Sequence, residues 1–146
     1  MSLIENKKAY FNYEIGEKFD AGMELLGFEV KAVKNKQGSL EGAYVIVRGG
    51  EVYLINAHIP PYQPANAPKD YDPYRNRRLL LTKKEIAELS LAEGTKGLTI
   101  VPISVYNKGR KLKLSIGIGK GKKKTDRRQS IKKRDTEREL GRTLKR

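Results

Sequence analysis

The chain has 146 residues with one histidine and no cysteine, and its formal net charge at pH 7 is +14. This length fits one domain with a substantial core, and the composition excludes disulfides, a cysteine–histidine zinc site and a thiol nucleophile. The chain has no N-terminal apolar segment and no run of about 18 apolar residues, so we expect a soluble, cytoplasmic monomer that has no membrane partner.

The first segments predict strands that bend at glycines. Ala9–Ile15 is a mixed aromatic stretch that reads as a strand, and the alternation resumes over Lys18–Leu26. We interpret the two as one ribbon bent around Gly16 and Gly22, because glycine is how small barrels turn corners. Phe28–Asn35 carries apolar and basic residues at mixed spacings, which favours a short helix.

The middle of the chain carries the clearest local signal. Ala43–Arg48 and Glu51–Asn56 alternate on either side of a Gly-Gly pair, which predicts a β-hairpin. Ile59–Tyr74 holds five of the six prolines and reads as a long surface loop. Arg77–Leu81 follows as a strand with an apolar end.

The last folded segments predict one helix and a second hairpin. Thr82 and Glu85 form a capping box in front of a helical pattern that Gly94 ends. Leu98–Tyr106 and Lys111–Ile118 then alternate as a hairpin. About six short strands with two or three short helices predict a mostly β protein, a small closed antiparallel barrel of the oligonucleotide-binding (OB) type.

The positive charge is concentrated beyond this predicted barrel. The first 119 residues hold 18 basic and 13 acidic side chains, whereas residues 120–146 hold 13 basic and 4 acidic ones. We therefore predict a folded domain over residues 1–119 and a basic tail over residues 120–146 that is disordered when free. Helix formers without proline over Ile131–Arg146 indicate that the tail can become helical against a polyanion. Its aliphatic residues are too few for a membrane surface, which favours nucleic acid.

Catalysis is not indicated. His58 has no orienting partner in the pattern, the carboxylates are scattered, and we predict no metal, cofactor or active site. The informative group is Arg75, Arg77 and Arg78, which suits bidentate phosphate binding, although charges on a strand edge also deter aggregation. The tyrosines of the proline-rich loop are open to two interpretations, base stacking or packing at a barrel rim.

Several blocks in order give the chain a family resemblance. They are Asn6–Ala9, Ala21–Gly22, Gly27–Lys31, Gly50–Glu51 with Leu54, Asp72–Arg75, Arg78–Leu81, Lys84–Ile86, Gly97 with Val101–Pro102 and Tyr106, Lys120–Lys123 and Asp126–Arg128. In this order they resemble the SmpB family of SsrA-binding proteins, which partner transfer-messenger RNA in the rescue of stalled ribosomes. The resemblance runs from Asn6 to about Arg138. Asp20, Thr125 and Arg127 depart from the residues usual in that family.

The resemblance implies a barrel that binds the transfer-RNA-like domain of transfer-messenger RNA. It also implies a tail that reaches the decoding region of the ribosome and its empty messenger channel. Asp20, Leu80 and Lys113 match family positions that support RNA binding, and Asp126 to Arg128 match the tail motif. Together with the basic residues, the predicted RNA-binding set on the barrel is Lys7, Lys8, Asp20, Lys31, Arg75, Arg77, Arg78, Leu80 and Lys113. The predicted set on the tail, for ribosome and RNA binding, is Lys120, Lys122, Lys123, Lys124, Asp126, Arg127 and Arg128.

Two other functions fit the same charge pattern. A general single-strand-binding barrel without a ribosomal role would be indicated by surface aromatic residues at regular strand positions. A basic assembly protein embedded in the ribosome would explain the tail as a rigid insertion. An enzyme is the reading that the sequence supports least.

Overall fold

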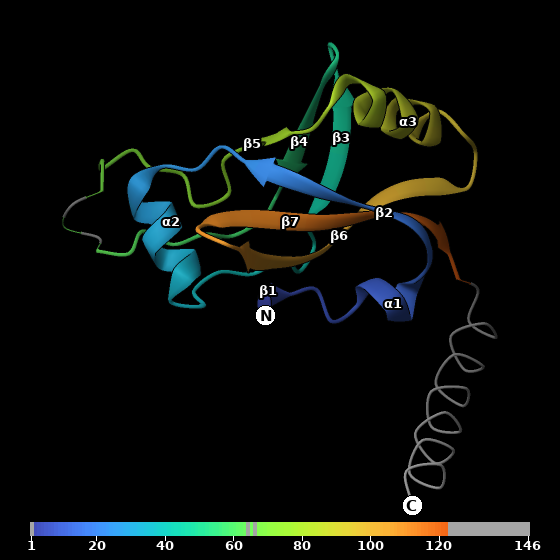
Figure 1. Ribbon diagram of the computed structural model, residues 1–146. Coiled ribbons are helices and arrows are strands. Elements are labelled where there is room, and N and C mark those ends of the chain that lie inside the picture. Colours follow the sequence, from blue (N-terminus) through green and yellow to red (C-terminus); the bar gives the residue numbers. More distant parts are fainter. Residues whose placement is uncertain (1, 64, 66, 123–146) are drawn as a thin grey trace, which may run out of the picture.

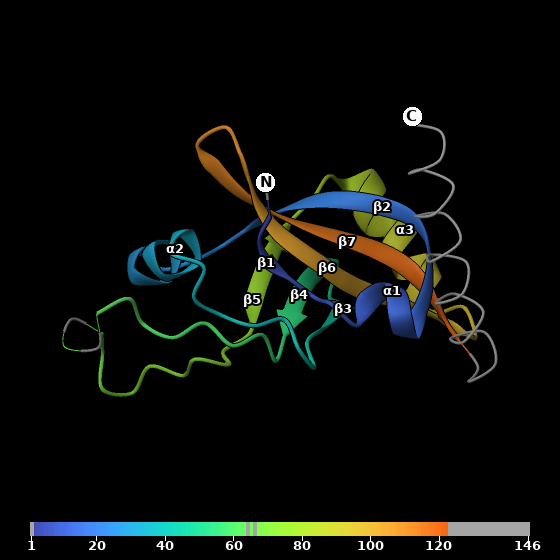
Figure 2. The same cartoon turned by 90° about the horizontal axis from the view of Figure 1, so that it is seen from below.

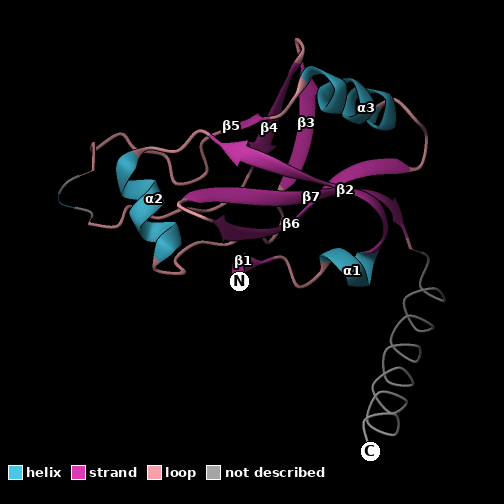
Figure 3. Ribbon diagram, in the orientation of Figure 1, coloured by secondary structure: helices cyan, strands magenta, loops and turns pink. Residues whose placement is uncertain are grey.

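The computed structural model describes residues 2–63, 65 and 67–122. In this part of the chain, strands predominate and three helices flank them (Figure 1; Figure 3). The strands are β1 (Ser2–Glu5), β2 (Tyr13–Met23), β3 (Tyr44–Arg48), β4 (Glu51–Ile55), β5 (Arg77–Leu80), β6 (Leu98–Lys108) and β7 (Lys111–Gly121). The helices are α1 (Ala9–Asn12), α2 (Gly27–Lys34) and α3 (Lys83–Glu93).

The strands form one antiparallel sheet in the order β1-β6-β7-β2-β5-β4-β3. The sheet curls so that β3 contacts β6, although the two strands are far apart in this order. Helix α2 and the long loop lie at one end of the sheet and α1 lies at the other (Figure 2). The prediction of a mostly β, antiparallel domain is therefore confirmed.

The predicted closure of the barrel is not found among the described residues, because no ladder joins β1 to β3. Side chains occupy the outer edge of β3 instead. The amide of Val47 donates to Glu93 of α3 at 2.7 Å, and its carbonyl accepts from Arg48 at 2.6 Å. A strand whose edge groups are used in this way does not offer them to another strand.

The core lies inside the curl and follows the alternation of the strands. Leu54, Leu114 and Ile116 are completely buried, and α3 and α2 add Leu89 and Val33 to the same cluster. Burial of one face of each strand fixes the register, since a slip by one residue would turn every apolar side chain outward. The opposite faces of β2, β5 and β7 consequently point away from the core.

The turn and the helix cap predicted from local sequence are confirmed. Gly49 and Gly50 have φ of +60° and +76°, the left-handed values that a two-residue hairpin turn requires. Thr82 caps α3, since its Oγ1 accepts from the Glu85 amide at 3.2 Å and its own amide donates to the Glu85 carboxylate at 3.0 Å. The helix predicted over Phe28–Asn35 is α2.

The two ends of the domain differ from the prediction. Residues 9–12 form a helix rather than a strand, β1 was not predicted, and β7 continues past Ile118 to Gly121. Ile4 of β1 is buried in the main core. Ala9 packs with Val101 and Ile103 in a small second core, which covers β7 at Gly117 and Gly119.

Glycines in β7 allow this covering. A Cβ at Gly117 would lie 2.7 Å from Ile15 and 3.1 Å from Ile103, so only glycine fits there without a shift.

No helix of the described part is long and apolar enough to cross a membrane.

Candidate nucleic-acid interface

One row of residues crosses four strands on the outer face of the sheet. Leu80 of β5 pairs with Gly22 of β2, Gly22 with Lys113 of β7, and Lys113 with Tyr106 of β6. Leu80 is 45% exposed and lies over Gly22, where an added Cβ would come within 3.1 Å of the leucine. The sequence-predicted residues Leu80 and Lys113 thus lie on one accessible surface.

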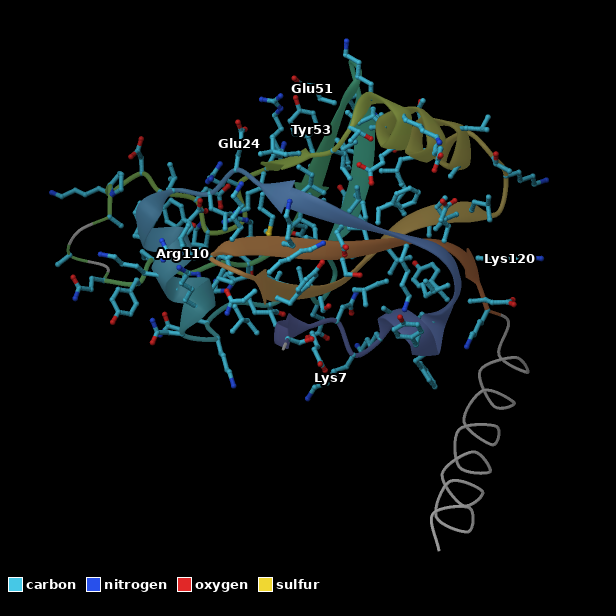
Figure 4. All side chains as sticks on the ribbon, viewed as in Figure 1. Lys7, Glu24, Glu51, Tyr53, Arg110 and Lys120 are labelled. Carbon is cyan, nitrogen blue, oxygen red and sulfur yellow. The ribbon has the colours of Figure 1, made fainter. Side chains whose placement is uncertain are left out.

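A groove of about 390 Å³ runs beside this row, at the α2 end of the sheet. Its apolar part includes Leu80, Leu25 and Leu112. Its cations come from α2 and from the β6–β7 hairpin, whose tip carries Arg110 (Figure 4). The four are Lys34, Arg110, Lys111 and Lys113, and none forms an ion pair with a carboxylate of the described residues.

Asp20 lies on β2 two residues before Gly22, and its carboxylate interacts with two side chains, those of Lys108 and Tyr106. Lys108 Nζ is 3.7 Å from Asp20 Oδ2, and Tyr106 makes a side-chain hydrogen bond to Asp20. Burial and then this hydrogen bond raise the pKa of Tyr106 to about 12, so the hydroxyl stays protonated and remains a donor. Asp20 therefore orders two side chains beside the groove.

Arg77 does not belong to this surface. It was predicted to bind phosphate with Arg75 and Arg78, but its side chain is completely buried. Its guanidinium donates to Glu29 Oε2 from Nε at 3.0 Å and from Nη2 at 2.7 Å. The carbonyls of Ala57, Arg75 and Pro73 accept from it at 2.7, 3.0 and 2.9 Å. A guanidinium with these partners has no N–H directed at solvent, so this prediction is wrong for Arg77.

Glu29 holds this buried network together. Burial would raise the pKa of Glu29, but hydrogen bonds from Arg75, the Leu26 amide, Tyr71 and Arg77 outweigh it and lower the pKa from 4.5 to about 2. Burial and the bond to Glu29 raise the pKa of Tyr71 to about 12. The network joins α2 to β5 and to the end of the proline-rich loop.

Arg75 and Arg78 are more accessible but are also paired. Arg75 Nε donates to Glu29 at 3.0 Å. Arg78 lies on the outer face, 3.3 Å from Glu24 and 3.4 Å from Glu51. The structure therefore does not bring the three arginines together as one phosphate-binding cluster.

The remaining predicted residues lie elsewhere. Lys31 is exposed on α2. Lys7 and Lys8 line a separate hollow of about 300 Å³ with Ser39 and Glu41, and Lys8 pairs with Glu41 at 3.1 Å. These positions leave the RNA-binding role of all three lysines a prediction.

The root of the predicted tail is part of the folded domain. Lys120 is in β7, at the end of the strand opposite Arg110 (Figure 4). Lys122 donates from its amide to Asn12 and from Nζ to Tyr10, at 2.9 Å each. The other predicted tail residues, Lys123, Lys124, Asp126, Arg127 and Arg128, lie outside the described residues.

Sequence reasoning missed the groove cations Lys34, Arg110 and Lys111 and the buried carboxylate Glu29. A signal existed for Lys111, which shares the polar face of the β7 alternation with Lys113. For Glu29 the sequence offers only an acid in the first turn of a helix. The described residues contain no cluster of carboxylates and histidine that could hold a metal ion.

Comparison with known proteins assigns the chain to a family. The family model described as "SmpB protein" matches residues 3–146. The chain belongs to the SmpB family. An SmpB relative from Prochlorococcus marinus (strain MIT 9515), named SsrA-binding protein, is 50% identical over 144 residues, which are 99% of this chain and 87% of that protein. An SsrA-binding protein from Elusimicrobium minutum (strain Pei191) is 47% identical over 140 residues, or 96% of this chain and 88% of that protein.

A solved structure agrees with the fold of this SmpB chain. It is described as "tmRNA-SmpB: a journey to the center of the bacterial ribosome" and is 38% identical. The TM-score is 0.68, and the match covers 82% of this chain and 84% of that one. The resemblance seen in the sequence blocks is thereby confirmed.

Proposed function

We propose that this SmpB-family protein binds the transfer-RNA-like part of transfer-messenger RNA and delivers it to stalled ribosomes. Similar proteins are named SsrA-binding proteins, and the description of the solved relative joins SmpB with this RNA and the ribosome. The observation that carries the proposal is structural. Asp20, Leu80 and Lys113 come from three neighbouring strands and lie on one outer face beside a groove with four cations.

Each part of this face has a role that suits RNA. Unpaired lysine and arginine side chains bind phosphates and release counterions. Leu80 offers an exposed apolar contact to a base or sugar next to those cations. A curled sheet that is open along one seam suits an OB-type barrel, which binds oligonucleotides on its strand surface. The role is binding and positioning without catalysis, and it would be performed in the cytoplasm.

The tail has the second role in this proposal. Residues 120–146 carry a net charge of +9, and the family match extends to residue 146. We propose that Lys120, Lys122, Lys123, Lys124, Asp126, Arg127 and Arg128 contact the ribosome along its empty messenger channel. Lys120 and Lys122 would begin this path at the end of β7 remote from the groove.

The experiment compares Lys113→Gln with Lys83→Gln, an exposed lysine on α3 that serves as the charge-matched control. Binding of a transfer-messenger RNA transcript is measured from 50 to 200 mM salt. Lys113→Gln should flatten the log–log salt slope by about 0.7–0.9, the value for one phosphate contact. Lys83→Gln should leave the slope unchanged. Equal effects of the two substitutions, or a parent chain that binds transfer-messenger RNA no better than an unrelated duplex, would contradict the proposal.

A further inference from the structure

The charge pattern on the outer face changes at β5. On the β7 side of Leu80, the cations Lys113, Lys111 and Arg110 are unpaired among the described residues. On the β4 side, Arg78 lies between two carboxylates. Glu24 and Glu51, labelled in Figure 4, lie on either side of Arg78, next to β5.

Arg78 is held from both sides. Its Nη1 is 3.3 Å from Glu24, which directly follows β2, and its Nε is 3.4 Å from Glu51 on β4. The Tyr53 hydroxyl donates to the second oxygen of Glu51 at 2.7 Å and so orients that carboxylate. The Arg78 carbonyl also accepts a hydrogen bond from the Glu24 amide at 3.0 Å. This backbone bond holds Glu24 and Arg78 next to each other.

This arrangement carries a net charge of −1, because two carboxylates face one guanidinium. The Arg78 side chain is 44% exposed, but a phosphate that approached it would meet the two carboxylates beside the guanidinium. A like charge that faces a ligand is unfavourable and therefore suppresses wrong modes of binding. The groove on the other side of Leu80 presents cations without this obstacle.

We propose that Glu24 and Glu51 are specificity-determining residues that end the RNA-binding face at β5. Their negative charges keep phosphate groups from binding Arg78. The RNA backbone therefore follows the β6–β7 hairpin and does not continue onto β4. The inference rests on the proposed function, since it names the boundary of that same face. It assigns the two glutamates and Arg78 to the choice between RNAs rather than to affinity.

The test uses the full chain, the double variant Glu24→Gln/Glu51→Gln, the single variant Arg78→Gln and the triple variant. Glu88→Gln on α3 is the control for the loss of one negative charge. The probes are the transfer-RNA-like part of transfer-messenger RNA and an unrelated RNA hairpin duplex of equal length. Binding is measured from 50 to 200 mM salt, and a thermal melt verifies that each variant is folded.

The double variant frees Arg78, so its salt slope on the duplex should steepen by about 0.7–0.9, one phosphate contact. Over the fourfold salt range this is roughly a threefold larger loss of affinity. Its preference for transfer-messenger RNA should fall accordingly. Arg78→Gln should not change the slope in the parent chain, and in the triple variant it should remove the added slope. Glu88→Gln should change affinity for both RNAs by the same factor.

Three results would overturn the inference. They are a flatter slope for Arg78→Gln in the parent chain, an unchanged slope for the double variant, and an equal steepening by the Glu88 control. The salt slopes measured on the duplex test the inference even if the parent chain binds transfer-messenger RNA no better than the duplex. A parent without that preference would instead contradict the proposed function.

Discussion

Glu29→Gln isolates the energy of the buried network. The amide keeps the size of the side chain but removes the charge opposite Arg77, which is completely buried. Removal of one partner from a buried ion pair costs about 3–5 kcal/mol, because the other charge remains without compensation. We therefore expect the variant to be folded but markedly less stable at pH 7. Its urea midpoint should fall by roughly 1–2 M for a chain of this size.

The same carboxylate makes stability depend on pH with a definite sign. The pKa of Glu29 is lowered in the folded chain, from 4.5 to about 2. Its contribution is therefore complete above about pH 5, where the unfolded chain is also ionised, and is lost as pH falls towards 2. A shift of this size corresponds to about 3 kcal/mol. The gap in stability between parent and variant should narrow over this range.

The assay is urea unfolding followed by circular dichroism at pH 7 and pH 3 at constant ionic strength. Glu88→Gln, at a partly exposed position of α3 that forms no ion pair among the described residues, is the control and should stay within about 0.5 kcal/mol of the parent. A Glu29→Gln variant within about 1 kcal/mol of the parent at pH 7 would refute the reasoning. So would a gap of the same size at both pH values.

Three further outcomes are expected from the structure. Leu80→Ala should lower RNA affinity with little change in the melting curve, because the side chain is 45% exposed; a melting loss of the 2–5 kcal/mol typical of core leucines would contradict this. Gly117→Ala should destabilise by about 1–3 kcal/mol, since its Cβ would lie 2.7 Å from Ile15, whereas Gly27→Ala meets nothing within 4 Å and serves as the control. A chain that ends after Lys122 should unfold cooperatively and bind transfer-messenger RNA but should not support the rescue of stalled ribosomes. Loss of cooperative unfolding would show that the tail belongs to the core.

The sequence predicted those elements whose cause is local. The Gly-Gly turn of the β3–β4 hairpin and the Thr82–Glu85 box of α3 are formed by residues adjacent in the chain, and both are present. The helix at Ala9–Asn12 has a distant cause. It forms where Ala9 packs on Val101 and Ile103, and a short aromatic stretch does not reveal such a partner.

The candidate site divides in the same way. Lys113 could be placed beside Lys111 from alternation along one strand, and both line the groove. The binding partners of Arg75, Arg77 and Arg78 could not be predicted, because they are carboxylates from other elements. Glu29 is more than 40 residues away from these arginines in the chain, yet it binds two of them. A cluster of arginines in the sequence predicts that anions bind there. It does not show whether the anion is a phosphate of RNA or a carboxylate of the protein itself.

Pairing therefore decides how much of the basic charge is available to RNA. The first 119 residues contain 18 basic side chains, and the ion pairs of the described part already engage Lys8, Arg48, Arg75, Arg77, Arg78 and Lys108. The groove offers four that are not engaged in this way, which at about 0.7–0.9 per contact gives the domain alone a salt slope of about 3. The 13 basic side chains from Lys120 onward add to that slope only where RNA or the ribosome meets them. A chain ending after Lys122 with a slope near 3 on transfer-messenger RNA would thus locate recognition in the groove, and a slope near 1 would show that most of its cations face water.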